Sequence, residues 1–350
     1  MKEKTKLITI FCIAGVLVIG LSLNTAASIL TMKNVDELKA LISENMSTDQ
    51  DVAQENDVVI AGEYEIKSTQ KISDAYISHD ASALTDKEKE TLDMASEILK
   101  EIIKEGMTDY EKELAVYDWM THKLRQDKGI LTVIPSTQAD CDNPYGVLKY
   151  HNAVCVGYAT TFRMFMQMMN IECMVVHNSE RYHSWDLIKL DGEWYHTDIY
   201  SDAETRNYMC FNQNDAMFSD RSWNTDFFPT STGLKYNYGY QNKSMIDDVH
   251  EIASTLKKAI DEKKAYAFIG FNSGITEENA QIAETMLNGI SDKISYSDEY
   301  NKYTITWKYI PIENNQFILC IYVNGFEQEN NGVTEEETQK IQEIINEVFN

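Results

Sequence analysis

The chain has 350 residues, enough for about two domains of ordinary size. Hydrophobic residues make up 43% and charged residues 25%, which is usual for a globular protein. Acidic residues outnumber basic ones by 56 to 31, so the net charge is -25. Because such a chain repels nucleic acid and anionic membrane surfaces, we expect no nucleic-acid partner.

The N-terminus has the pattern of a targeting segment. Lys2, Lys4 and Lys6 precede an apolar run from Leu7 to Leu23, and Thr25-Ala26-Ala27 offers small residues at which a signal peptidase can cut. The run is also just long enough to span a bilayer, so a cleaved signal peptide and a retained membrane anchor both fit. In either case we expect the rest of the chain to be extracytoplasmic, secreted or anchored to the cell membrane.

Five cysteines follow the targeting segment: Cys141, Cys155, Cys173, Cys210 and Cys320. An odd number leaves at least one thiol outside any disulfide within a monomer, and Cys155 is our candidate for that thiol. The sequence has no C-x-x-C pair, so neither a thioredoxin-like site nor a zinc ribbon is expected.

Several elements are predicted ahead of Cys155. In chain order they are a polar, acidic arm over residues 28–56, short strands at Val58–Ile60 and Glu63–Ile66, a helix from Thr85 that stops before Gly106, and a helix that begins at Thr108. Residues 126–151 are rich in Gly, Pro, Asp and Asn, which predicts a long irregular loop that could form one wall of a cleft.

Residues 155–169 predict a helix that begins at Cys155, with Tyr158, Phe162 and Met166 on the same face as the cysteine. At a helix start, unpaired backbone N–H groups and the positive end of the dipole face the side chain. Both favour a thiolate, which is the form of cysteine that attacks a carbonyl. A strand at Cys173–His177 follows.

A hairpin is predicted next, because two strand-like segments flank Asp191-Gly192, a two-residue turn signal. With this turn, Trp185 faces Asp198 across the hairpin. His183 and Asp198 then lie on the same sheet face as diagonal neighbours, with Cβ atoms about 7 Å apart. One extra residue in the turn would put them on opposite faces.

Cys155, His183 and Asp198 can therefore supply a thiol nucleophile, its base and a group that orients the base. Each alone would more often be structural, and the three together indicate chemistry. His151 and His177 are weaker candidates for the base, because His151 lies in the irregular segment and His177 ends a strand.

A metal site is an alternative use of the same hairpin. His196 shares a strand face with Asp198, and His183 lies near them, which gives two histidines and one carboxylate. The set lacks an independent motif such as H-E-x-x-H. We therefore expect neither a metal nor a cofactor.

The rest of the chain predicts a linker and a compact α+β module. In chain order the elements are a strand at Tyr208–Phe211, a linker core at Thr225–Gln241, a helix at Ile246–Ala259, a strand at Tyr266–Phe271, a helix at Thr276–Ile290, strands at Tyr303–Trp307 and Phe317–Val323, and a helix at Thr334–Phe349. No residue pattern of an active site occurs in this module.

The region from Thr85 to Asn224 resembles the transglutaminase-like superfamily, which is papain-like in its Cys-His-Asp chemistry. The matching motifs are Val154-Cys155-x-Gly157-Tyr158-Ala159, His183-x-Trp185 and Asp191-Gly192-x-Trp194-Tyr195-x-x-Asp198. The resemblance implies an α+β fold in which the cysteine helix packs on an antiparallel sheet. It also implies that Cys155 is the nucleophile, His183 the general base and acid, and Asp198 the residue that orients the imidazole. Tyr150-His151-Asn152 departs from a glycine-containing approach, so only the backbone N–H of Cys155 is assigned to the oxyanion.

We divide the chain accordingly into residues 1–27 as signal peptide or membrane anchor, 28–84 as arm and short strands, 85–224 as catalytic domain, 225–244 as linker and 245–350 as a smaller C-terminal α+β module. The resemblance implies a thiol acyl-transfer enzyme that acts on peptide or carboxamide bonds through a thioester, and the targeting segment predicts that it is extracytoplasmic. Hydrolysis is favoured over crosslinking because water is abundant, and the substrate would be a protein or a cell-wall peptide. The alternative is a catalytically inactive cell-surface binding protein of the same fold.

Overall fold

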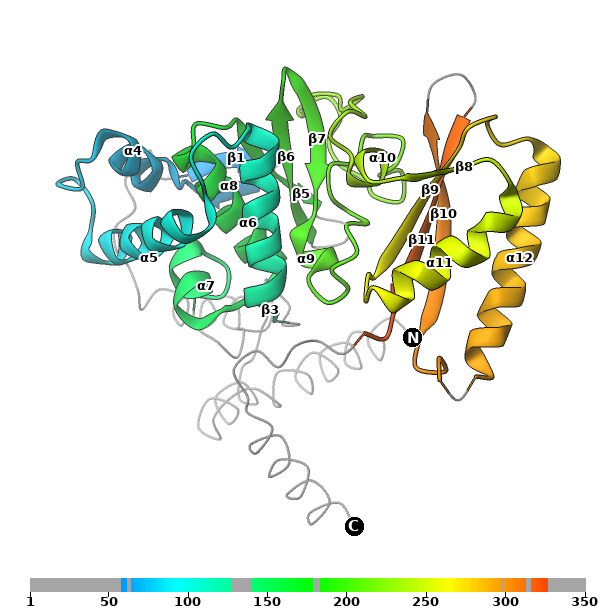
Figure 1. Ribbon diagram of the computed structural model, residues 1–350. Coiled ribbons are helices and arrows are strands. Elements are labelled where there is room, and N and C mark those ends of the chain that lie inside the picture. Colours follow the sequence, from blue (N-terminus) through cyan, green and yellow to red (C-terminus); the bar gives the residue numbers. More distant parts are fainter. Residues whose placement is uncertain are drawn as a thin grey trace, which may run out of the picture.

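The structure, a computed structural model, describes residues 58–61, 64–127, 140–178, 183–297, 299–312 and 316–326. The predicted targeting segment, the arm and the predicted helix at Thr334–Phe349 lie outside the described residues. In the part of the chain that is described, no helix combines the length and apolar character needed to cross a membrane. Figure 1 shows helices and sheets mixed in an α+β arrangement, with a separate sheet in each half of the molecule.

Two short strands and three helices come first: β1 (Val58–Ala61), β2 (Tyr64–Lys67), α4 (Gln70–Ser78), α5 (Asp86–Ile102) and α6 (Asp109–Lys123). Thr85 and Thr108 form capping boxes with Glu88 and Glu111, so both predicted helix starts are confirmed. The two predicted strands are confirmed as an antiparallel hairpin. The sequence pattern does not predict α4, because this short helix is largely polar.

The predicted irregular loop over residues 126–151 is wrong in its second half, which contains α7 (Pro144–Tyr150). Asn143 caps this helix by accepting a hydrogen bond from the N–H of Gly146. Pro144 occupies the first turn, where its missing N–H costs nothing. The turn-forming residues that suggested a loop are therefore the start signal of a helix. α7 leads the chain to Cys155.

Strand β3 (Arg125–Gln126) pairs in parallel with β4 (Asn152–Ala153), directly before the next helix. That helix, α8 (Cys155–Met168), starts at Cys155 as predicted. It is apolar on nearly all sides, and Phe162 and Phe165 are fully buried, as expected for a helix at the centre of a core.

The three-stranded antiparallel sheet against α8 has the order β5 (Cys173–Asn178), β6 (His183–Leu190) and β7 (Glu193–Thr197). Leu190 pairs with Glu193 across the turn, which confirms the predicted hairpin register. Asp191 and Gly192 both have positive φ, 49° and 87°, as a tight two-residue hairpin turn requires.

After β7 the chain forms α9 (Ile199–Asp202) and then a long stretch of turns. The strand predicted at Tyr208–Phe211 is wrong, since these residues form turns. The cause is local: the Asp202 carboxylate accepts the N–H of Cys210, whose carbonyl accepts the N–H of Asp198. These bonds tie the segment to α9 and leave it no strand partner.

The C-terminal module contains β8 (Ser244–Ile246), η1 (Val249–Glu251), α11 (Ile252–Asp261), β9 (Tyr266–Phe271), α12 (Glu277–Ser295), β10 (Thr304–Ile312) and β11 (Gln316–Asn324). The sheet order is β10-β11-β9-β8, and only β8 pairs in parallel. The helix predicted from Ile246 is wrong at its start, because Ile246 ends β8. Asp248 caps η1 in a capping box with Glu251, so the helical backbone begins after it.

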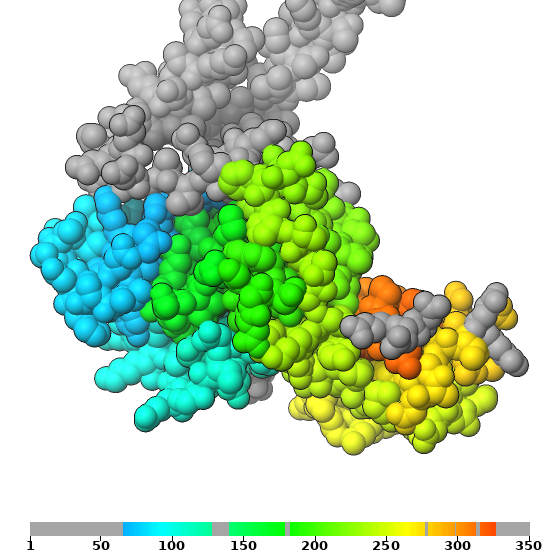
Figure 2. Space-filling model, turned by 90° about the horizontal axis from the view of Figure 1, so that it is seen from above, coloured from blue at the N-terminus to red at the C-terminus, as the bar shows by residue number. Residues whose placement is uncertain are grey.

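The two halves meet through aromatic side chains. Tyr238, in α10 (Tyr238–Gln241), stacks on Tyr208 with ring centroids 3.7 Å apart, and its hydroxyl lies 3.0 Å from that of Tyr266 in β9. In Figure 2 the yellow-green chain that includes α10 lies between the green half and the C-terminal sheet. The segment that the sequence marks as a linker is thus packed on both sides, with Phe228 and Asn237 buried.

Candidate active site

Cys155 is the first residue of α8, and only 6% of it is exposed. The preceding residue, Val154, is at the N-cap position, and its side chain does not cap the first backbone N–H groups of the helix. The backbone N–H of Val154 instead donates to the carbonyl of Cys141 at 3.1 Å. The thiol therefore lies at the positive end of a buried helix.

Gly157 explains part of the cysteine motif. A Cβ atom at this position would lie 2.1 Å from the carbonyl oxygen of Cys141, closer than any real contact allows. The backbone before α7 therefore presses directly on the first turn of α8. Only glycine permits this approach, which fixes Cys155 against the segment of Cys141.

His183 is the first residue of β6 and reaches Asp198 as the hairpin register predicts. Its Nε2 atom donates to Oδ2 of Asp198 at 2.7 Å. Burial lowers the pKa of His183, but the charge and hydrogen bond of Asp198 and a further hydrogen bond with Cys155 raise it to about 9. Since Asp198 takes Nε2, the ring nitrogen left for Cys155 is Nδ1. The structure thus brings all three predicted residues together.

Asp198 is 1% exposed and caps α9. It accepts hydrogen bonds from the backbone N–H of Ser201 at 3.0 Å and from the Ser201 hydroxyl at 2.7 Å, besides the bond from His183. Burial acts to raise the pKa of this carboxyl, but the charges of Arg221 and His183 hold it well below its usual range. Asp198 is therefore a buried carboxylate with every oxygen engaged.

Arg221 is a site residue that sequence reasoning misses. Its Nη1 atom pairs with Oδ2 of Asp198, and its Nη2 atom donates to the Ser201 hydroxyl at 2.9 Å. The guanidinium lies over Phe218, 4.3 Å from the ring centroid, and near Trp185. Arg221 comes from an irregular stretch without a periodic pattern or motif, so only the three-dimensional path of that stretch reveals it.

His196 does not join the histidine and carboxylate of the alternative metal set. The indole N–H of Trp185 donates to its Nδ1 atom at 3.0 Å, and its Nε2 atom faces Asp215 at 2.9 Å. Both ring nitrogens are therefore directed at other partners, and burial lowers the pKa of His196. Among the described residues, no three His, Cys, Asp or Glu side chains are grouped as a metal site.

The competing histidines lie in different surroundings. His177 is the last residue but one of β5 and contacts the Ser184 hydroxyl at 2.7 Å. Burial and the nearby charge of His183 lower the pKa of His177. His151 follows α7 in a left-handed conformation and faces the ring of Trp119.

Tyr200 forms an aromatic wall beside the site, which the sequence does not reveal. Its ring lies 5.9 Å from that of His183 and 5.5 Å from that of Tyr158. Its hydroxyl donates to the carbonyl of Asp127, the residue after β3, at 3.3 Å. Burial, with the Cys155 charge second, raises the pKa of Tyr200 to about 12, so the hydroxyl keeps its proton.

Three of the four other described thiols, those of Cys173, Cys210 and Cys320, are embedded in apolar or acidic surroundings. Burial, aided by Asp186, raises the pKa of Cys173 well above normal, and burial raises that of Cys320 to about 12. Cys210 is similar, with burial first and Asp202 second as causes. No disulfide joins the cysteines in the described ranges. These three thiols are therefore poor nucleophiles at neutral pH.

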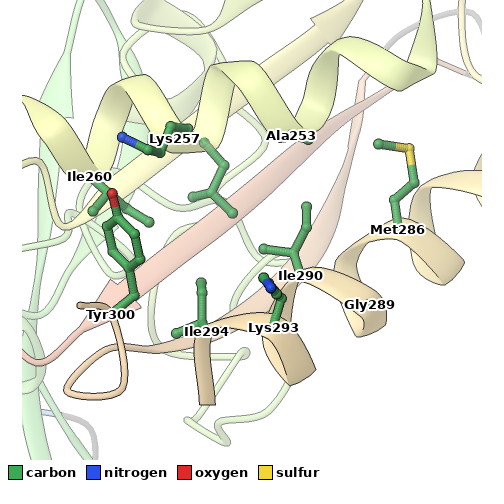
Figure 3. A pocket seen from close by; sticks show the side chains of 10 residues that line it. Ala253, Lys257, Ile260, Met286, Gly289, Ile290, Lys293, Ile294 and Tyr300 are labelled. Atoms are coloured by element: carbon green, nitrogen blue, oxygen red, sulfur yellow. The ribbon is translucent and has the colours of Figure 1, made fainter. Parts of the chain in front are cut away.

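A pocket of about 400 Å³ lies elsewhere, between α11 and α12 of the C-terminal module (Figure 3). Its lining is mostly apolar, with Lys257, Lys293 and Tyr300 at its side. It contains no thiol, histidine or carboxylate. We therefore assign the chemistry to the cysteine site rather than to this pocket.

Comparisons with known proteins bear on the core of this description. Residues 96–199 match the family model described as "Transglutaminase-like superfamily". The human protein "Kyphoscoliosis peptidase" is 22% identical over 116 residues, which is 29% of this chain but only 17% of that protein, less than a fifth of its length. A solved structure described as "Crystal structure of a TGase" is 13% identical, covers 47% of this chain and 37% of that one, and has a TM-score of 0.29. The family match confirms the expected transglutaminase-like core within an α+β fold.

Proposed function

We propose that this chain is a thiol acyl-transfer enzyme in which Cys155 is the nucleophile, His183 the general base and acid, and Asp198 the residue that orients the imidazole. The observation that carries the proposal is the buried 2.7 Å contact between His183 Nε2 and Asp198, together with the hydrogen bond between the same ring and Cys155. An imidazole held between a carboxylate and a thiol at a helix start is the arrangement that activates a cysteine.

In the first half of the reaction, the Cys155 thiolate attacks the carbonyl carbon of a carboxamide or peptide bond. The backbone N–H of Cys155 stabilises the oxyanion that forms. The C–N bond breaks as the His183 imidazolium gives its proton to the leaving nitrogen, which departs as ammonia or an amine. The product on the enzyme is a thioester at Cys155.

In the second half, water attacks the thioester carbonyl while His183 accepts a proton from it. The C–S bond breaks, the carboxylic acid leaves, and the Cys155–His183 pair is restored. An amine in place of water would give a crosslink. Hydrolysis is favoured by the abundance of water, and the word "peptidase" in the name of the human relative is in line with it.

The predicted N-terminal targeting segment supports an extracytoplasmic site of action, with a protein or a cell-wall peptide as substrate. The alternative is a catalytically inactive cell-surface binding protein. One observation favours it: Cys155 is only 6% exposed, so a substrate must gain access before it can react.

Replacement of the nucleophile separates these functions. Wild type and Cys155→Ala are incubated with glutamine-containing peptides, with and without a fluorescent primary amine. Released ammonia, new peptide termini and incorporated amine are measured by mass spectrometry. We expect acid products from wild type and a loss of at least about three orders of magnitude in the variant.

Cys173→Ala is the matched control, because Cys173 is a buried thiol outside the site. Its turnover should stay near that of wild type. Equal turnover by wild type and Cys155→Ala would refute the proposal. If amine incorporation dominates, the proposed reaction is crosslinking and not hydrolysis.

A further inference from the structure

We propose that Arg221 is the positioning residue that sets the pH range in which Cys155 and His183 form a reactive thiolate–imidazolium pair. The inference rests on the proposed function and adds a fourth member to its site. Arg221 acts through Asp198 and has no contact with the reacting atoms among those described.

The first step is the contact itself. Arg221 uses two nitrogen atoms of one guanidinium: Nη1 pairs with Asp198, and Nη2 holds the hydroxyl of Ser201, which in turn donates to Asp198. The Arg221 side chain is 14% exposed and that of Asp198 is 1% exposed. A planar fork of donors suits this double task, whereas a lysine supplies the charge but not both contacts.

The second step is the sum of charges. Without Arg221, a thiolate, an imidazolium and the Asp198 carboxylate would leave one uncompensated negative charge in a buried site. A buried unpaired charge is costly, and the chain already carries a net charge of -25. With Arg221, the charges alternate from Cys155 through His183 and Asp198, and they sum to zero. Loss of the thiol proton beside the imidazolium therefore takes the site from +1 to zero with Arg221, but from zero to -1 without it, so Arg221 favours the thiolate.

The third step is the fixed place of the guanidinium. It lies over the Phe218 ring at 4.3 Å and 5.7 Å from the Trp185 centroid. The Trp185 ring also lies 6.0 Å from that of His183 at 25°, so one indole neighbours both the arginine and the histidine. Aromatic walls on this side exclude water and strengthen the interactions between the charges.

Other ionisable groups also face these four residues. They are His177 of β5, Asp186 of β6, His196 of β7, Tyr200 and Asp202 of α9, and Cys210 and Asp220 of the following segment. Burial raises the pKa of Asp202 to about 7, so this carboxyl titrates in a relevant range. Because Asp202 is present in every variant below, its titration alone does not make the profile of one variant differ from that of another.

The test is the pH dependence of alkylation at Cys155, which needs no substrate. Iodoacetamide labelling of each cysteine is followed from pH 4 to 10 by peptide mass spectrometry in wild type, Arg221→Gln and Arg221→Lys. Removal of a positive charge disfavours the thiolate, so the midpoint for Arg221→Gln should move to higher pH by about one unit. Arg221→Lys keeps the charge and should recover most of the shift.

Arg163→Gln is the matched control, because Arg163 is a second buried arginine, bonded to Thr69 and the Lys67 carbonyl. It should leave the midpoint unchanged, whereas a general loosening of the fold would move it too. If Arg221→Gln does not fold, Arg221→Met, which has an apolar unbranched side chain without the charge, takes its place.

Coincident profiles for wild type and Arg221→Gln would overturn the inference while leaving the proposed function intact. An equal shift in Arg163→Gln would also overturn it. If wild-type Cys155 reacts no faster than Cys173, the proposed function fails, and this inference fails with it.

Discussion

At the scale of single residues, the protonation of His183 is decided by its two partners. Burial favours the neutral ring, yet Asp198 and Cys155 raise the pKa to about 9 from an ordinary value of 6.5. Because the folded pKa is the higher one, the stabilisation is complete below pH 6.5 and is lost as the pH rises through 9. For Asp198 the pKa is lowered, so its contribution is present above 3.8 and is lost as the pH falls below that value.

We therefore predict that His183→Gln costs most stability near pH 6. The difference in free energy of unfolding between wild type and variant should shrink by about 3 kcal/mol between pH 6 and pH 9.5. Urea unfolding at several pH values measures it. His79→Asn, at an exposed helix end, controls for the loss of a histidine. A difference that does not change with pH would contradict the assignment.

At the scale of elements, the start of α8 depends on close contact with the backbone ahead of α7. A Cβ on Gly157 would meet the Cys141 carbonyl at 2.1 Å and a methyl group of Val147 at 3.0 Å. The first is rigid backbone, so the helix start would have to move. Since Cys155 lies in the same turn, its place beside His183 depends on this glycine.

Gly157→Ala should accordingly destabilise the fold by about 2 kcal/mol or more and slow the alkylation of Cys155. Gly289→Ala is its control: Gly289 lies within α12, and a Cβ there meets nothing within 4 Å. This control should be neutral or stabilising by up to about 1 kcal/mol. Urea denaturation separates the two, and a Gly157→Ala protein as stable as wild type would disprove the steric argument.

The sequence predicts an element well where its signals are local. The Asp191-Gly192 turn fixes the hairpin register, and with it the meeting of His183 and Asp198. Thr85 and Thr108 mark helix starts by their capping boxes. Arg221 is different, because it reaches Asp198 from turns whose path is set by tertiary contacts. The prediction misses the start of α7 for another reason, because an Asn-Pro pair signals both a turn and a helix cap.

At the scale of the whole molecule, the aromatic contacts of α10 couple the two sheets. Tyr238 stacks on Tyr208 in one half and contacts Tyr266 and Phe268 of β9 in the other. The stretch before β8 also packs against the hairpin, because Gly233 lies directly on the ring of Tyr195. The halves therefore share one continuous packed region.

We predict that wild type unfolds in a single calorimetric transition. Tyr238→Ala should lower the free energy of unfolding by about 3 kcal/mol and separate the transitions of the two halves. Tyr296→Ala, at a side chain that is 89% exposed, should change stability by less than about 0.5 kcal/mol. Two separate transitions in wild type would show that the aromatic contacts do not couple the halves.

The central claim is that Cys155 is a thiol activated by His183, and site-resolved alkylation tests it most directly. The rate of iodoacetamide labelling of each cysteine is measured at pH 7 in native wild type and in His183→Gln. We predict that Cys155 reacts at least about tenfold faster than Cys173, Cys210 or Cys320 and loses this advantage in the variant. A Cys155 rate no greater than that of Cys320, or one unchanged in His183→Gln, would contradict the claim.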